Sequence, residues 1–225
     1  MAQRIEDYGL IGDRHTAALV GRDGSIDWLC LPRFDSASTF GALLGDEHHG
    51  RWLLSPAAGG AVATRRYRGD TLILETTWET PAGAVLVTEL MPSGNRRADV
   101  VRRVTGLRGT VRMHQEVRIR FGYASALPWV RQAGTGSDPV LLAVAGPDAL
   151  AIRGPQLTAT DHLHVAEFDV AEGETVDIVA TWYPSHRHLP DPIDVDAALA
   201  ETITDWEGWS ASLAHDGPHR ELVIR

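Results

Sequence analysis

Val111-Arg-Met-His-Gln-Glu-Val-Arg-Ile-Arg-Phe121 alternates apolar with polar side chains almost throughout. Successive side chains of an extended chain point to opposite faces, so Val111, Met113 and Val117 share one face and the charged residues share the other. This pattern is typical of a strand with one face in a protein core and the other in water. The run therefore predicts antiparallel β structure.

Neighbouring segments repeat the pattern and pair through turn residues. We expect residues 100–104 to form a hairpin with this run, and residues 71–79 to form one with residues 84–91. A third hairpin is predicted for residues 16–20 and 25–31, because Asp23-Gly24 offers the positive φ of a tight turn. Further strands are expected at residues 51–54, 61–67, 129–132, 140–145, 149–153, 163–170 and 175–183. Short strands at this spacing predict an all-β fold, a large antiparallel β-sandwich of the supersandwich type.

Two helices are expected. A short one is predicted at residues 38–44, between a Ser36 cap and Gly45. A longer one follows Asp194, which can cap it, with apolar residues every three or four positions. These residues are Val195, Leu199, Ile203, Trp206, Trp209 and Leu213. The sequence thus predicts a sandwich domain over residues 1–190 and an amphipathic linker helix within residues 191–225.

Composition excludes several classes of function. The net charge is −9, the chain has no Lys, and its Arg residues are scattered, so we expect no nucleic-acid partner and no Schiff-base chemistry. No apolar run approaches the length of a membrane span, and the N-terminus has no secretory signal, which predicts a cytoplasmic protein with no membrane partner. The single Cys30 cannot form an internal disulfide.

Candidate acids and ligands are present without a complete site. Glycoside hydrolysis needs two carboxylates facing each other. Five acids cluster in the first forty positions: Asp7, Asp13, Asp23, Asp27 and Asp35. Turns and caps explain Asp23 and Asp35. A second group consists of residue types that can bind metals: His186, His188, Asp191, Asp194 and Asp196. Their spacing matches no recognised zinc site, and the same residues are also typical of a solvated loop. We expect no metal site and no cofactor.

The aromatic residues carry a more specific hypothesis. The chain has 7 Trp, and sugar rings stack their C–H faces on indoles while Asp and Arg bind their hydroxyls. Five neighbouring residues have the composition of a sugar-contacting loop: Asp27, Trp28, Arg33, Phe34 and Asp35. The alternative is that Trp28 only packs in the core.

Several segments resemble a known enzyme family. They are Ile5-Glu-Asp-Tyr-Gly-Leu-Ile-Gly-Asp13, residues 16–36, Phe40-Gly-Ala-Leu-Leu44, Arg66-Tyr67, Leu72-Ile-Leu-Glu-Thr76, Val100-Val-Arg-Arg-Val104, Pro128-Trp-Val130 and Trp206-Glu-Gly-Trp209. Together they resemble bacterial glycoside hydrolase family 15 proteins, the glucoamylase-like and trehalase-like enzymes, with the trehalase-like branch the nearest match.

The resemblance implies a β-sandwich, a linker helix and then a catalytic barrel of paired α-helices that hydrolyses α-glucosidic bonds with inversion. The catalytic glutamates of such enzymes lie in the barrel, so we expect the chain to stop short of them and to carry no catalytic residue. Its expected partners are that barrel, in the same polypeptide, and a carbohydrate substrate. The open alternatives are a stand-alone α-glucan-binding module and self-association through the stripe on residues 195–213.

Overall fold

The computed structural model describes residues 3–93, 97–134 and 138–224. The strands are β1 (Gly9–Gly12), β2 (Ala17–Val20), β3 (Ser25–Cys30), β4 (Ser38–Phe40), β5 (Arg51–Pro56), β6 (Ala61–Tyr67), β7 (Leu74–Thr80), β8 (Gly83–Leu90), β9 (Ala98–Arg118), β10 (Trp129–Ala133), β11 (Val140–Ala145), β12 (Asp148–Arg153), β13 (Thr158–Thr160), β14 (Leu163–Ala171) and β15 (Thr175–Pro184). The α-helices are α1 (Val195–Ala211) and α2 (Arg220–Ile224), and three 3-10 turns lie at Ile5–Asp7, Ala42–Leu44 and Glu47–His49.

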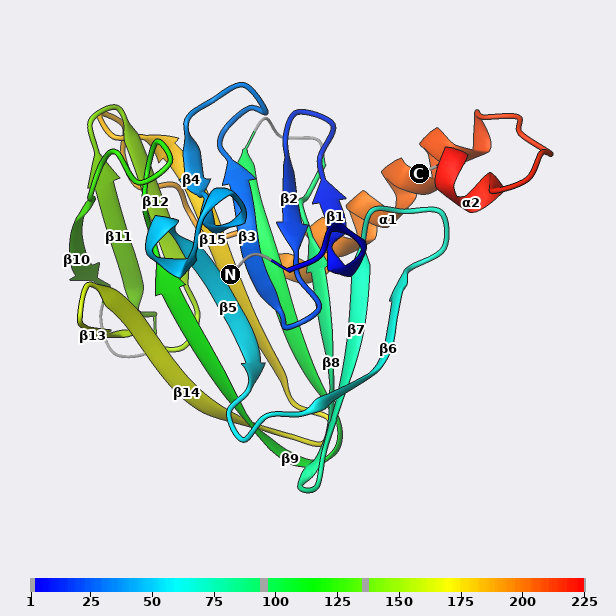
Figure 1. Ribbon diagram of the computed structural model, residues 1–225, viewed down its shortest axis with the longest axis horizontal. Helices are drawn as coiled ribbons and strands as arrows, with labels where there is room; N and C mark the ends of the chain where they lie inside the picture. Colours follow the sequence, from blue (N-terminus) through cyan, green and yellow to red (C-terminus); the bar gives the residue numbers. More distant parts are fainter. Residues whose placement is uncertain (1–2, 94–96, 135–137, 225) are drawn as a thin grey trace.

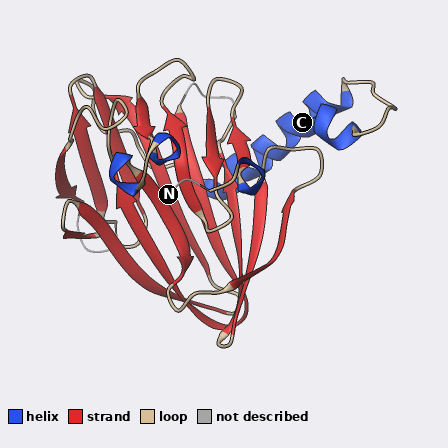
Figure 2. Cartoon of the chain, viewed as in Figure 1, coloured by secondary structure: helices blue, strands red, loops and turns tan. Residues whose placement is uncertain are grey.

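The strands form two antiparallel sheets that share one long strand (Figure 1). In the first sheet β1, β2, β3 and β5 lead to the second half of β9, which pairs on its other side with β14. In the second sheet β6, β7 and β8 lead to the first half of β9, and β15, β12, β11 and β10 continue beyond it. The predicted all-β sandwich is confirmed, and Figure 2 shows how strongly strands dominate.

β9 corrects one sequence prediction. Residues 100–104 and 110–121 do not form a hairpin, because residues 98–118 are one strand of 21 residues. Gly109 has φ +63, and an added Cβ there would lie 2.2 Å from the Ala82 carbonyl oxygen. Even-numbered residues such as Val100 and Val104 point into the main core before Gly109, and odd-numbered residues such as Val111 and Met113 do so after it. A bulge opposite β8 accompanies the change, so the strand leaves one sheet and enters the other.

Other predictions on the strands and turns hold with small changes. The hairpins β2–β3 and β7–β8 form as expected, and Gly24 has φ +84 in its turn. The seven further strands all appear within one or two residues of their predicted ends. The helix predicted at residues 38–44 is wrong in its first half, because Ser38–Phe40 pairs with β3 and only Ala42–Leu44 forms a 3-10 turn.

The main core lies between the sheets and contains a buried ion pair. Trp52 and Phe40 are fully buried and pack with ring centroids 6.4 Å apart. Arg102 of β9, also fully buried, stands 2.7 Å from Glu89 of β8 and donates to the main-chain oxygens of Trp52 and Gly24 at 2.8 and 2.5 Å. Because Trp52 lies in β5 of the first sheet and Gly24 in the turn before β3, Arg102 joins the two sheets through the core.

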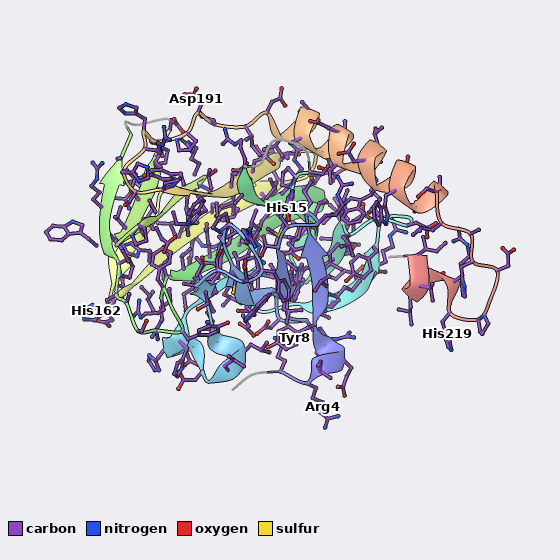
Figure 3. The ribbon with its side chains drawn as sticks, turned by 90° about the horizontal axis from the view of Figure 1, so that it is seen from above. Arg4, Tyr8, His15, His162, Asp191 and His219 are labelled. Carbon is purple, nitrogen blue, oxygen red and sulfur yellow. The ribbon has the colours of Figure 1, made fainter. Side chains whose placement is uncertain are left out.

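The outer face of the second sheet is covered by the C-terminal part of the chain. We call residues 185–194 the strap; Ser185 N donates to the Pro147 oxygen near its start. The strap leads into α1, whose N-cap is Asp194 as predicted, with Oδ1 accepting from Ala197 N at 3.0 Å. Figure 3 shows Asp191 on the strap at the edge of the molecule, with α1 following it. Val195 and Trp206 of the predicted stripe are buried, whereas Trp209 is 47% exposed.

Neither helix has the length and apolar character that crossing a membrane requires in the described ranges.

Candidate functional site

Four of the five predicted sugar-contacting residues, Trp28, Arg33, Phe34 and Asp35, lie at the end of β3 and in the loop that follows it. Trp28 and Phe34 pack with ring centroids 5.0 Å apart and planes inclined at 59°. Phe34 is 61% exposed and Trp28 is half-buried, so the pair presents aromatic surface to solvent. Trp28 is thus neither fully buried nor fully exposed, and its contact with a sugar stays a prediction.

Arg33 and Asp35 flank this aromatic pair. The Arg33 Nε and Nη2 atoms donate to Asp35 Oδ1 and Oδ2 at 2.8 and 3.0 Å. The ion pair lowers the pKa of the Asp35 carboxyl, mainly through the hydrogen bond from Arg33, and both side chains are 70% exposed. An exposed pair of this kind offers both donors and acceptors to the hydroxyl groups of a ligand.

Asp27 lies apart from the other four candidates. Its carboxylate is 6% exposed and accepts from Tyr8 Oη at 2.7 Å and Ser25 Oγ at 2.5 Å. Burial raises the pKa of Asp27 and, together with the hydrogen bond to Asp27, raises that of Tyr8. The arrangement ties the N-terminal segment to β3. The sequence could not separate Asp27 from Trp28, because adjacent strand residues point to opposite faces and neither face was known.

A neighbouring turn joins this loop to helix α1. Phe34 N donates to the His15 oxygen at 3.0 Å, and Asp13 Oδ1 accepts from the His15 and Thr16 amides at 2.8 Å. Between Asp13 and His15, Arg14 adopts φ +74 and reaches α1. No spacing in the sequence indicated this link, since it joins segments almost 200 residues apart.

Arg14 stacks over two tryptophans of the helix. Its guanidinium carbon lies 5.7 Å from the ring centre of Trp206 and 6.0 Å from that of Trp209, and the side chain stands 3.6 Å from Asp205. We call residues 13–16 and 28–36 together with Trp209 the loop end. Its two loops lie at the upper end of the molecule in Figure 1, and Figure 3 shows His15 between the N-terminal strands and α1.

The remaining candidate acids and histidines lie in surface ion pairs, in a turn or on the strap. Asp7 pairs with Arg22 at 3.1 Å, and Asp23 Oδ1 accepts from Ser25 N at 2.9 Å in the β2–β3 turn. His186 and His188 are exposed on the strap. Within the described ranges, no three His, Cys, Asp or Glu side chains gather in a way that could hold a metal ion.

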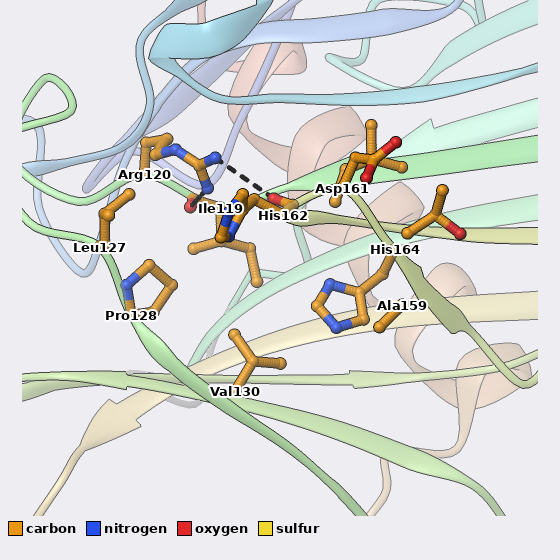
Figure 4. Close-up of a pocket in the computed structure, with 11 residues that line it drawn as sticks. Ile119, Arg120, Leu127, Pro128, Val130, Ala159, Asp161, His162 and His164 are labelled. Carbon is orange, nitrogen blue, oxygen red and sulfur yellow. Dashed lines mark hydrogen bonds between the residues drawn. The ribbon is translucent and has the colours of Figure 1, made fainter.

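A hollow of about 360 Å³ lies between the end of β9, β10 and the β13–β14 turn (Figure 4). Arg120 lines it, but its guanidinium donates to the main-chain oxygens of Ile119 and His162 at 2.7 and 3.2 Å. Burial lowers the pKa of His164, another lining residue. Arg120 is thus tied to main-chain oxygens, and the His164 imidazole beside it is partly buried.

The same fold is found in a solved structure. A bacterial glucoamylase in complex with acarbose shares the fold, with a TM-score of 0.68 and 9% identity, over 92% of this chain and 37% of that chain. The model of the family described as "Trehalase-like, N-terminal" matches residues 1–170. The chain belongs to this trehalase-like N-terminal family.

Curated relatives agree with this assignment. Trehalases of Mycolicibacterium smegmatis and Mycobacterium tuberculosis are 28% and 29% identical to the chain over 91% of its length. Trehalase 1 of Sulfolobus acidocaldarius is 33% identical over 59% of the chain. The chain spans 34% and 33% of the two mycobacterial proteins, about a third of their length.

Proposed function

We propose that the chain is the non-catalytic N-terminal domain of an enzyme that hydrolyses α-glucosidic bonds, in trehalose or in maltose-type glucans. In this proposal α1 and α2 contact a catalytic barrel of the same polypeptide. The loop end contributes Trp28, Arg33, Phe34 and Asp35 to the rim of the substrate pocket. Support comes from the trehalase relatives and from the surface of the domain.

The observation that carries the proposal is a set of exposed apolar side chains in the loop end and over residues 209–223. Its large side chains are Phe34 (61% exposed), Trp209 (47%), Leu213 (39%), Leu222 (75%) and Val223 (55%). Exposed apolar surface of this kind marks a contact with another protein surface or with a ligand. The Arg14 bridge keeps the loop and α1 in one arrangement, so a domain docked on the helix would meet the loop as well.

The surroundings of Asp27 and Asp35 support the proposed non-catalytic role. A glycosidase acid with a raised pKa must reach the glycosidic oxygen. Asp27 has a raised pKa, but it is buried and both carboxylate oxygens accept from Tyr8 and Ser25. The other candidate acid of this region, Asp35, forms an ion pair with Arg33. These two carboxylates therefore do not form an acid and base pair.

The test uses the protein in its own cells. An antibody against this domain should detect a species much larger than 24.5 kDa, and the immunopurified protein should release glucose from trehalose or maltose. The recombinant 225-residue chain alone should release none. Hydrolysis by the recombinant chain would contradict the supporting role. A native species of 24.5 kDa without hydrolysis would instead favour the stand-alone carbohydrate-binding module.

A further inference from the structure

Arg14 lies at the point where the first sheet meets helix α1. It belongs to the turn between β1 and β2, and its φ of +74 is a left-handed conformation that residues other than glycine rarely adopt. Such conformations are unfavourable, and they persist where the surrounding contacts impose them and a function needs the resulting geometry. The contacts of this turn therefore indicate what Arg14 is held in place to do.

Hydrogen bonds fix the turn to the loop that follows β3. Asp13 Oδ1 accepts from the amides of His15 and Thr16, and Asp13 N donates to the Thr16 oxygen at 3.3 Å. Thr16 Oγ1 donates to the Cys30 oxygen at 2.5 Å, just before that loop begins. Phe34 N of the loop donates to the His15 oxygen. The turn and the loop therefore move as one unit.

The other side of this junction is the second half of α1. Asp205 Oδ2 accepts from Ser93 Oγ at 2.5 Å and stands 3.6 Å from the Arg14 guanidinium. Trp206 is 5% exposed, and the Arg14 guanidinium lies over its ring and over that of Trp209. Ser93 follows β8 of the second sheet. Arg14 therefore connects the first sheet to a part of the helix that Ser93 already ties to the second.

The length of α1 makes the Arg14 contact sensitive to small movements. Val195, Leu199 and Ile203 in its first half pack on the second sheet, so the helix can tilt about this half if the contacts of its second half are lost. Trp209 lies about 20 Å along the axis from Val195, and a tilt of about 3° would move it by about 1 Å. A displacement of about 1 Å can change the rate of an enzyme by about 100-fold.

We propose that Arg14 is a positioning residue for the substrate pocket of the proposed enzyme. By holding the second half of α1 against the β1–β2 turn, it fixes the loop that carries Trp28 and Phe34 relative to the domain that follows the helix. The inference rests on the proposed function, in which a domain docked on α1 meets this loop. Arg14 itself touches no substrate and acts through the position of Phe34.

The test measures the kinetics of the full polypeptide that contains this chain, with trehalose and maltose as substrates. Arg14→Met removes the cation, Arg14→Lys keeps a cation over the two tryptophans, and Arg14→Gly suits the left-handed turn but lacks the side chain. Arg22→Met is the matched control, since Arg22 is an exposed arginine of the β2–β3 turn that pairs with Asp7 at 3.1 Å.

Two further measurements separate positioning from a general loss of structure. Phe34→Ala, alone and combined with Arg14→Met, completes a double-mutant cycle, which shows whether the two residues act through the same contact. Amide hydrogen exchange in α1 reports whether the second half of the helix has loosened. Circular dichroism checks that each variant folds.

We expect Arg14→Met and Arg14→Gly to raise KM about three- to tenfold with little change in kcat, because the rim of the pocket moves while the reacting groups do not. Arg14→Lys should restore most of the loss, and Arg22→Met should match the wild type. Amide exchange should become faster in residues 205–211 and stay unchanged in residues 195–199. The effects of Arg14→Met and Phe34→Ala should not add, because each disturbs the same contact with the substrate.

Three results would overturn the proposal: an unchanged KM in Arg14→Met, an equal loss in Arg22→Met, or additive effects in the double-mutant cycle. Each would make Arg14 a structural contact only and would leave the proposed function intact. A Phe34→Ala variant with unchanged KM would instead remove the loop from the pocket. Absence of hydrolysis by the full polypeptide would refute the proposed enzyme and, with it, this role of Arg14.

Discussion

Replacing Arg102 by Met tests the buried link between the sheets. The substitution keeps the length of the side chain but removes the ion pair to Glu89 at 2.7 Å, both main-chain hydrogen bonds and a cation–π contact with Trp52 at 5.1 Å. Glu89 is 1% exposed and would remain in the core without its counter-charge. Breaking a buried pair in this way costs about 3–5 kcal/mol, a large part of the about 5–15 kcal/mol that stabilises a typical domain.

The assay is equilibrium unfolding in urea, followed by tryptophan fluorescence and extrapolated to water. Arg112→Met is the control, because Arg112 forms only exposed ion pairs with Glu167 and Asp169 and should change the unfolding free energy little. Adding Glu89→Leu to Arg102→Met should recover part of the loss by removing the stranded carboxylate. Two results would refute the reasoning. One is a loss of unfolding free energy in Arg102→Met no greater than in Arg112→Met. The other is a double variant that is less stable than Arg102→Met alone.

Three further predictions concern single positions. Gly109→Ala should destabilise the chain and broaden its amide spectrum around β9, because the residue has φ +63 and its Cβ would meet the Ala82 oxygen at 2.2 Å; unchanged urea unfolding would contradict this. Asp194→Ala removes the N-cap of α1 and should cost about 1 kcal/mol, with faster amide exchange in the first turn as the readout. Asp27→Asn isolates the pH dependence of one carboxyl: burial raises the pKa of Asp27 above 3.8, so its stability contribution is lost as pH rises through the folded pKa, and the stability of the wild-type chain minus that of the variant should fall over that range. A difference that grows as pH rises would show that Asp27 is instead stabilised as a carboxylate.

Local pattern was sufficient for most of the secondary structure. Period-two runs located the strands of both hairpins and the seven further strands, and Asp194 with its apolar spacing located α1. β1 and β13 were missed, since strands of four and three residues are too short to show a period. Ser38–Phe40 was misassigned because its pairing with β3 overrides a weak helix signal.

The candidate site was predicted less completely than the fold. Trp28, Arg33, Phe34 and Asp35 are close in sequence and stay together in space, so composition alone could suggest a shared surface. Asp27 belongs to a different environment, and Arg14 joins the site through contacts with α1 that no local pattern encodes. Burial and the direction of each side chain decide such membership, and both depend on the assembled sheets.

The amino-acid sequence by itself determined the β class, the order of most strands, the capped C-terminal helix and the resemblance to trehalase-like proteins. These follow from interactions within a few residues and from motif identity. Only the tertiary structure decided that residues 98–118 are one strand crossing between sheets, because two runs out of phase around Gly109 predict a turn and a bend equally well. It also decided which charges are buried: Arg102 and Arg153 are ordinary arginines in the sequence, and distant segments packed over them make Arg102 a link through the core and bind Arg153 to the Pro190 oxygen.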